Sequence, residues 1–333
     1  MRACQVHQLG EPRDVVRLGE APEPSAGPGQ LLVRVLAAGV NFPDVLMCRG
    51  EYQVRPPRPF TPGIEVCAEV VVLGSGVSGF SIGQRVIGST VLPTGGFAEL
   101  SLMEQTSTFA APPGLEDAQA AVFHVGYQTG WFGLHRRAHL RAGETLLVHA
   151  AAGGVGSAAV QLGKAAGARV IGVVGGPDKA AAARALGADV VVDRRTEDFV
   201  TVVKEVTNGR GADVVFDPVG GDAYQRSAKC VAFEGRILVI GFAGGQIQAP
   251  ALNHALLKNY SIVGLHWGLY PSKDPQAVRQ CHDELSALAE GGLLAPLVSE
   301  CVPFAQAPAV LQRLADGATV GRVVLLPRSP PAR

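Results

Sequence analysis

Residues 143–156 read Gly-Glu-Thr-Leu-Leu-Val-His-Ala-Ala-Ala-Gly-Gly-Val-Gly, and this stretch decides the fold. Residues 145–149 carry no charge, as is typical of a buried parallel strand. They lead into glycines that begin an Ala-rich helix. A second apolar stretch, 168–174, follows at the distance that completes a βαβ unit. Glycines let the backbone turn tightly and approach a pyrophosphate, which then lies at the positive end of the helix. The pattern predicts a dinucleotide-binding turn; the alternative is a Gly/Ala-rich loop before an ordinary helix.

The tip of the second strand indicates which dinucleotide binds. NAD sites usually place an acid there for the ribose 2′-hydroxyl, whereas residues 174–176 are Val-Gly-Gly. Lys179 follows in the next turn, and Arg194 and Arg195 follow the third strand. Cations suit a 2′-phosphate, so we predict NADPH, although Lys179 alone could equally be a solvated helix charge. Asp178 is interpreted as a helix N-terminal acid that complements the dipole rather than as a displaced ribose ligand.

Composition restricts the classes of protein that this chain can be. Its 333 residues suggest two domains, and 29 Lys and Arg balance 29 Asp and Glu, which argues against a broad nucleic-acid surface. The six cysteines are scattered without a Cys-x-x-Cys pair, which favours reduced thiols in a cytoplasmic protein. No signal peptide or membrane-spanning run is visible, so we expect no membrane insertion.

The rest of the chain predicts an α/β fold in which a doubly wound parallel sheet interrupts a β-rich domain. The first third is β-rich and the middle third alternates strand and helix. A last strand after helices could return to the first domain, and the tail 327–333 is expected to fray. The expected strands are 31–36, 65–73, 84–88, 145–149, 169–174, 189–193, 213–217, 236–240, 261–264 and 322–326. The expected helices include 196–206, 223–231, 276–290 and 307–315.

The chain resembles the medium-chain dehydrogenase/reductase superfamily, on its zinc-free quinone oxidoreductase (zeta-crystallin-like) branch, over roughly residues 1–326. The most specific element is 143–156 with Gln161 and Lys164. Supporting elements are Ala-Gly-Val-Asn-Phe-Pro-Asp at 38–44, Pro-Gly-Ile-Glu at 62–65, Asp-Pro-Val-Gly at 217–220 and Gly-Arg-Val-Val-Leu at 321–325. The resemblance implies a GroES-like catalytic domain, 1–123 and 262–333, split by a Rossmann NADPH-binding domain, 124–261.

The resemblance also implies that no metal is bound. Alcohol dehydrogenases of the superfamily hold a catalytic zinc with Cys, His and Cys, and here Asn41, Ile64 and Val125 take those positions. Aliphatic side chains cannot ligate zinc, and we interpret the neighbouring His124 as a core histidine. Without a Lewis acid, alcohol oxidation loses its main stabilisation of an alkoxide.

Three candidate catalytic residues follow from the resemblance. Asn41 and Thr129 would contact the nicotinamide end, and Tyr52 would line the substrate cleft, where it could stack on a quinone or donate its hydroxyl. Asn41 could instead cap a helix, and Tyr52 could merely pack in its loop. Asp44 matches a superfamily acid that we expect to be structural.

Further residues would bind the cofactor by resemblance. They are Ala152, Gly153, Gly154, Val155 and Gly156 at the pyrophosphate, Gly176, Lys179 and Arg194 at the 2′-phosphate, Phe242 and Ala243 beside the nicotinamide, and Arg322 near the C-terminus. Many relatives carry Tyr at the position of Arg194, and Arg322 could instead be a strand-edge charge.

The implied function is reduction of a quinone or conjugated enone by NADPH without zinc. Such acceptors take hydride with little acid–base help, so the protein supplies orientation and a dry pocket. The alternatives are an enoyl-thioester reductase, which needs a basic patch and a proton donor, and a non-catalytic NADPH-binding structural protein. Because the strand near 260–265 pairs across dimers in this superfamily, we expect a homodimer.

Overall fold

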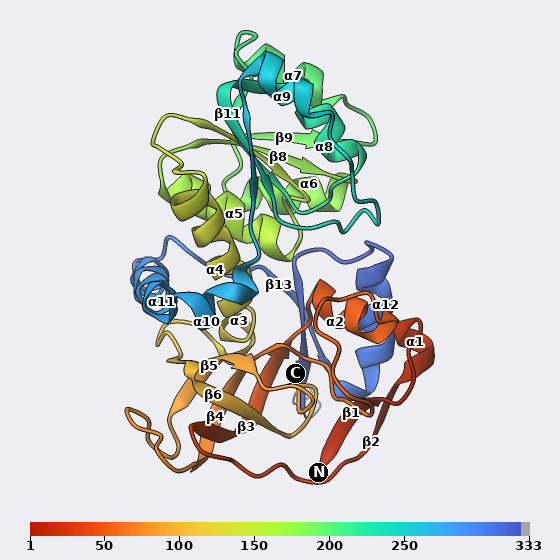
Figure 1. The fold of residues 1–333 in the computed structure, drawn as a ribbon, viewed down its shortest axis with the longest axis vertical. Helices are drawn as coiled ribbons and strands as arrows, with labels where there is room; N and C mark the ends of the chain where they lie inside the picture. Colours follow the sequence, from red (N-terminus) through yellow and green to blue (C-terminus); the bar gives the residue numbers. More distant parts are fainter. Residues whose placement is uncertain (328–333) are drawn as a thin grey trace. The chain divides into compact units, whose positions relative to one another are not determined.

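The computed structural model describes residues 1–327, and the chain divides into two compact units (Figure 1). Unit 1 comprises Met1–Val125 and the chain from Pro271 onward, and unit 2 comprises Gly126–Tyr270. The sequence predicts these boundaries at 123/124 and 261/262. The second boundary lies later because the strand at 261–264 belongs to the parallel sheet of unit 2. Of the expected frayed tail, residues 328–333 lie outside the described part of the chain.

Unit 2 is built around a six-stranded sheet in the order β12-β11-β10-β7-β8-β9, and every neighbouring pair is parallel. The chain runs outward from β7 through β8 to β9, then returns beside β7 and runs outward through β10 to β12. This change of direction at β7 is the topological switch point at which open α/β sheets bind ligands. The strands are β7 (Thr145–His149), β8 (Arg169–Val174), β9 (Val190–Asp193), β10 (Ala212–Asp217), β11 (Val231–Val239) and β12 (Ser261–Gly264).

The helices of unit 2 connect these strands and pack against them. Within the unit, α5 lies on β7 and β8, α6 on β8 and β9, and α8 on β10 and β11. The helices are α5 (Gly154–Ala165), α6 (Pro177–Ala185), α7 (Phe199–Val206), α8 (Asp222–Ser227) and α9 (Leu252–Lys258), with α4 (His124–Trp131) and a π-helix (Phe132–Arg137) before them. The predicted Rossmann architecture is therefore confirmed.

Two predicted helices of this unit were too long. The helix expected at 223–231 ends at Ser227, because Val231 pairs with Ala212 and so begins β11 five residues before the expected 236. The helix expected at 196–206 begins at Phe199, because the Asp198 carboxylate caps it. Its oxygens accept hydrogen bonds from the backbone N–H groups of Val200 at 3.3 Å and Thr201 at 3.1 Å.

Unit 1 contains a six-stranded sheet in the order β13-β14-β3-β4-β5-β6. An additional antiparallel pairing of β3 with β6 closes four of these strands into a barrel-like ring. The strands are β3 (Gln30–Gly39), β4 (Glu65–Leu73), β5 (Arg85–Thr90), β6 (Leu100–Ala110), β13 (Val298–Pro303) and β14 (Arg322–Leu326), with β1 (Arg2–Val6) and β2 (Val16–Glu20) forming a separate pair.

The last strand returns to the first part of the chain, as predicted. β14 pairs antiparallel with β3, where Val324 lies opposite Gly39, and parallel with β13. The core that this sheet encloses includes Phe60, Phe97 and Met103, all fully buried or nearly so. The helices of the unit are α1 (Pro12–Val15), α2 (Phe42–Arg49), α3 (Asp117–Ala120), α11 (Pro275–Glu290) and α12 (Ala307–Ala315), with α10 (Tyr270–Lys273) at the boundary. Nowhere in residues 1–327 is a helix both long and apolar enough for a bilayer.

Candidate functional site

The glycine turn of unit 2 is closed by backbone contacts that exclude side chains. After β7, Ala150 adopts a left-handed φ of 50°, and its carbonyl accepts a hydrogen bond from Gly153 N at 2.8 Å. A Cβ atom on Gly156 would lie 2.1 Å from that same carbonyl oxygen. Helix α5 begins at Gly154 and carries no acidic residue in its first turn. The free N–H groups at this helix start suit a pyrophosphate, so the turn fits the predicted cofactor.

Two guanidinium groups cover the glycines at the tip of β8. A Cβ on Gly175 would lie 3.3 Å from Nε of Arg194, and one on Gly176 would lie 2.7 Å from Nη1 of Arg195. The carboxylate of Asp193, at the end of β9, fixes this arrangement by accepting hydrogen bonds from Gly176 N at 2.9 Å and Arg195 N at 3.0 Å. Both arginines therefore lie where a phosphate on the adenosine ribose would need partners.

Lys179 completes this cation cluster from the first turn of α6. Its side chain is half-buried, and its pKa is lowered first by burial and then by the charges of Arg194 and Arg195. Three neighbouring cations repel one another, so a bound phosphate would relieve the repulsion. Asp178 is exposed in the same helical turn, at the positive end of the helix dipole.

Arg195 joins the two cations, Lys179 and Arg194, that the resemblance predicts as ligands of the 2′-phosphate. The dipeptide Arg194-Arg195 was visible after the third strand, but the strand pattern could not show that both side chains fold back over the glycines. The signal that could have revealed it is Asp193, whose pKa is lowered by hydrogen bonds from the Gly176 and Arg195 backbones. An acid at a strand end that binds backbone N–H groups holds the following turn in place.

The loops after β10 and β11 place the two residues expected beside the nicotinamide. The buried carboxylate of Asp217 ends β10 and accepts hydrogen bonds from Val219 N at 2.8 Å and Gly220 N at 2.9 Å. The ring of Phe242 lies against Gly220, where a Cβ would approach it to 2.8 Å. Ala243 N donates to the carbonyl of Pro218 at 3.0 Å. Phe242 and Ala243 are exposed and are held by backbone contacts. Thr129, the third residue of unit 2 that is expected near the nicotinamide, is buried in α4.

Unit 1 holds a buried polar cluster around Asn41. The amide nitrogen of Asn41 donates to Glu65 Oε1 at 2.9 Å, and its amide oxygen accepts from Arg322 Nη2 at 2.9 Å. Arg322 also forms an ion pair with Glu65, and the second Glu65 oxygen accepts from Val125 N at 2.9 Å. The side chain of Glu65 is fully buried and that of Arg322 is 5% exposed. Arg322 is therefore not a strand-edge charge, and it fixes the orientation of the Asn41 amide.

Asn41 does occupy the N-cap position of α2, but its side-chain amide binds Glu65 and Arg322 instead of serving only as a cap. Asp44, three residues later, accepts hydrogen bonds from Asn41 N at 2.9 Å and Gly63 N at 2.9 Å. Burial raises the pKa of Asp44 to about 7. These two backbone contacts give Asp44 the structural role expected from the sequence.

Tyr52 is half-buried and packs against the core of unit 1. Burial, followed by the charge of Asp44, raises the pKa of its hydroxyl, so the phenol stays protonated at neutral pH. A protonated hydroxyl keeps its ability to donate a hydrogen bond. The structure thus retains both interpretations of Tyr52, loop packing and substrate contact.

The positions of the superfamily zinc ligands offer no suitable donor set. Ile64 packs on the core and Val125 is buried, so only the amide of Asn41 is polar at these positions. Within residues 1–327, no group of three His, Cys, Asp or Glu could hold a metal ion. His124 is buried beside the ring of Phe109, with ring centroids 5.4 Å apart, and burial lowers its pKa to about 3. A catalytic zinc does not fit these residues.

A β-rich unit that is split by a parallel sheet with a dinucleotide turn defines a medium-chain dehydrogenase/reductase. Residues 27–113 match the family model of an alcohol dehydrogenase GroES-like domain, and residues 154–287 match that of a zinc-binding dehydrogenase. The quinone oxidoreductase-like protein 2 homolog of Nematostella vectensis is 37% identical over 326 residues, covering 97% of this chain and 88% of that protein. The chain belongs to the quinone oxidoreductase branch of the superfamily and is an oxidoreductase.

Two solved structures are similar over nearly the whole chain. A quinone oxidoreductase from Pseudomonas syringae pv. Tomato DC3000 superposes with a TM-score of 0.91 at 31% identity, covering 98% of this chain and 99% of that one. A mycobacterial protein in complex with NADPH also gives a TM-score of 0.91 at 31% identity, covering 98% and 100% of the two chains. The predicted family and fold are therefore confirmed.

Proposed function

We propose that this protein oxidises NADPH and reduces a quinone or a conjugated enone without a metal ion. The observation that carries the proposal is the cluster of Lys179, Arg194 and Arg195 at the glycines of the β8 tip, where an NAD site would carry an acid. The NADPH complex of the mycobacterial neighbour and the names of the quinone oxidoreductase relatives support it.

When bound, NADPH supplies the hydride, and the residues of the chain hold the cofactor and the acceptor in position. The glycine turn binds the pyrophosphate through backbone N–H groups, and the three cations bind the 2′-phosphate. We assign Asn41, Tyr52 and Thr129 to the nicotinamide and acceptor, with Phe242 and Ala243 beside the nicotinamide. Arg322 acts through Asn41, because it fixes the Asn41 amide by a hydrogen bond of 2.9 Å. An acceptor that is already electrophilic needs no Lewis acid. This agrees with the side chains at Asn41, Ile64 and Val125, which do not make up a set of metal ligands.

The experiment that tests the proposal is steady-state oxidation of NADPH, with NADH as the control cofactor. The acceptors are 1,4-benzoquinone, a naphthoquinone, an alkenal and crotonyl-CoA. We expect NADPH-selective turnover with the quinones or the alkenal, unchanged by a chelator, in a preparation without stoichiometric zinc. Turnover with the thioester alone would identify an enoyl-thioester reductase. Tight NADPH binding without any turnover would identify a structural, non-catalytic protein, and one zinc per chain would contradict the metal-free site.

Replacing Lys179 and Arg194 together by alanine should separate the two cofactors. Each charge-assisted hydrogen bond to a phosphate contributes about 1.5–3 kcal/mol, so NADPH affinity should fall by roughly 100-fold or more. NADH lacks the phosphate, and its affinity should change by less than about twofold. Titration of each cofactor by fluorescence measures both. Lys273→Ala, which removes one exposed lysine of unit 1, is the control for loss of a positive charge outside the predicted cofactor site. Equal weakening of NADPH and NADH would refute the assignment.

The exposed edge of the unit 2 sheet supports a second proposal, that the protein is a homodimer. β12 is the outer strand of the sheet and pairs there with β11. The preceding helix α9 exposes Leu252, Leu256 and Leu257, each more than 70% exposed. An unpaired strand edge beside an exposed apolar surface favours association with a second copy of the chain. We expect a dimer in sedimentation at micromolar concentration and a monomer for Leu256→Glu/Leu257→Glu. A monomeric wild-type protein would exclude this interface.

A further inference from the structure

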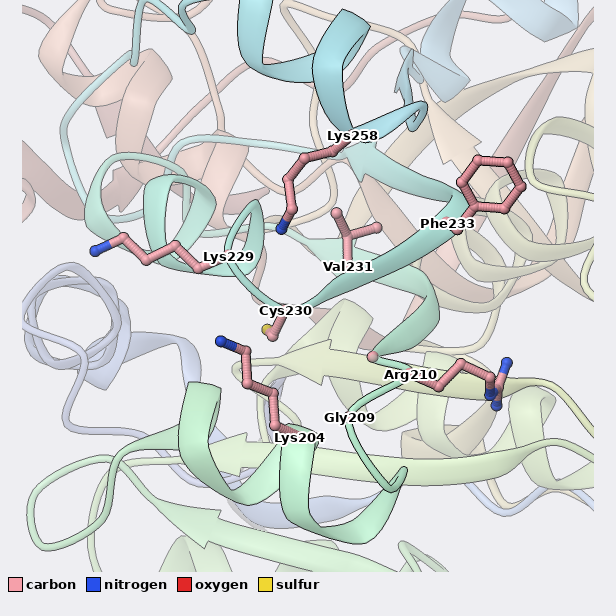
Figure 2. A pocket seen from close by; sticks show the side chains of 9 residues that line it. Lys204, Gly209, Arg210, Lys229, Cys230, Val231, Phe233 and Lys258 are labelled. Carbon is pink, nitrogen blue, oxygen red and sulfur yellow. The ribbon is translucent and has the colours of Figure 1, made fainter.

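A cavity of unit 2, shown in Figure 2, lies at the end of the parallel strands that is opposite to the glycine turn. Its volume is about 310 Å³, and its walls come from the end of α7, the loop before β10, the start of β11 and the end of α9. The cavity is thus at the amino ends of β10 and β11, whereas the glycine turn follows the carboxyl end of β7. Because all six strands are parallel, the two sites are separate.

Four cations line this cavity, and its lining contains no acid: Lys204, Arg210, Lys229 and Lys258. Figure 2 shows the amines of Lys204 and Lys258 directed toward one another across Cys230. Lys258 is anchored by donating to the carbonyl of Ala228 at 2.9 Å, and its pKa is lowered by burial and then by Lys204. Arg210 is already paired with Asp213.

Among the described residues that line the cavity, no carboxylate accompanies this lysine pair. Among residues 1–327, Lys204 and Lys258 form no ion pair. The Cys230 thiol between them is buried, and burial raises its pKa to about 12, so it is neutral at physiological pH. The charge of Asp198 also raises the pKa of this thiol, but the Asp198 carboxylate is itself paired with Arg226 at 2.5 Å. Two neighbouring lysines without a counter-ion favour an anion with several negative charges.

The rim of the cavity adds an aromatic surface. Phe233 also lines the cavity, yet it is 71% exposed. Figure 2 shows Val231 between the side chains of Lys258 and Phe233, and all three residues line the cavity. An exposed ring at the rim of a cavity that is lined by cations is suited to stack on a nucleobase. The cavity volume falls at the lower end of the range for small-ligand sites.

We propose that this cavity binds a nucleoside phosphate, with the phosphates between Lys204 and Lys258 and the base on Phe233. The site is independent of the dinucleotide turn, so it gives the protein a place where a small phosphorylated ligand can bind in addition to the cofactor. Neither the turn nor the Asn41 cluster contributes a residue to it.

The test is calorimetric titration of ADP into protein that carries one equivalent of NADPH, in about 0.15 M salt, a physiological ionic strength. NADPH fluorescence, recorded in parallel, reports whether ADP displaces the cofactor. We expect one ADP per chain with NADPH retained. Lys204→Gln and Lys258→Gln should each weaken ADP on the order of tenfold, because each removes a charge-assisted contact. Lys273→Gln, with the same change in charge outside the cavity, should bind like the wild type.

Pyrophosphate is the second probe, and it separates the base from the phosphates. Phe233→Leu should weaken ADP by roughly fivefold or more, through lost stacking, and leave pyrophosphate unchanged. Phe233 and Lys204 are exposed, so these variants should keep the wild-type thermal midpoint. Three results would overturn the proposal: no heat of ADP binding, release of NADPH in step with ADP binding, or equal loss for Lys204→Gln and Lys273→Gln. Equal effects of Phe233→Leu on ADP and pyrophosphate would overturn the nucleoside assignment.

Discussion

Gly156→Ala is expected to weaken NADPH binding by roughly 100-fold or more. The added Cβ would lie 2.1 Å from the carbonyl oxygen and 2.8 Å from the carbonyl carbon of Ala150. Both are backbone atoms of the turn, so they cannot move aside without displacing the N–H groups that bind the pyrophosphate. Displacing preorganised donors by about an ångström is enough to cost two orders of magnitude. Cofactor titration by fluorescence measures the loss.

Gly114→Ala is the matched control, because a Cβ at Gly114 meets nothing within 4 Å and the residue has no left-handed φ. This control should bind NADPH like the wild type. Gly156→Ala should retain the unfolding transition of unit 1, since the clash lies inside unit 2. Wild-type affinity in Gly156→Ala would show that the turn does not contact the cofactor.

Arg322→Met is expected to destabilise unit 1 by about 3–5 kcal/mol, the usual effect of removing one partner from a buried ion pair. Glu65 would remain fully buried, with its carboxylate facing only the Asn41 amide and the Val125 N–H. The loss of the 2.9 Å contact to Asn41 would also free that amide to rotate. Urea unfolding followed by circular dichroism measures the free energy of unfolding.

A double-mutant cycle with Glu65→Gln distinguishes the ion pair from simple loss of packing. The double variant Arg322→Met/Glu65→Gln carries no buried unpaired charge, so it should recover much of the stability that Arg322→Met loses. If the effects of the two single variants merely add, the pair has no energetic coupling and Arg322 stabilises the unit by packing alone. If Arg322→Met alone fails to fold, a folded double variant would itself demonstrate the coupling between Arg322 and Glu65.

Local patterns were sufficient to predict much of unit 2. The strand at 145–149, the glycine turn and the following helix are set by neighbouring residues, and the structure has them at Thr145–His149 and Gly154–Ala165. The helix predicted at 223–231 failed because no Pro or Gly separates the end of α8 from β11. Pairing of Val231 with Ala212, a tertiary contact, decides that boundary.

The polar cluster of unit 1 could not be predicted from local patterns. Glu65 and Arg322 are far apart in the chain, and they meet because β3 pairs with both β4 and β14. Sequence resemblance pointed to Arg322, but only the topology shows that its partner is Glu65. The same holds for the basic cavity, whose cations Lys204 and Lys258 come from different helices.

The return of β14 to β3 has a consequence for the order in which the chain folds during synthesis. Unit 2 is one uninterrupted stretch, so its sheet can be completed once β12 has emerged from the ribosome. The sheet of unit 1 instead waits for β13 and β14, and that closure spans most of the chain. Until Arg322 arrives, the Glu65 carboxylate lacks its counter-ion. The nascent first segment therefore keeps the strand edge of β3 that β14 will cover unpaired until the last strands have been made.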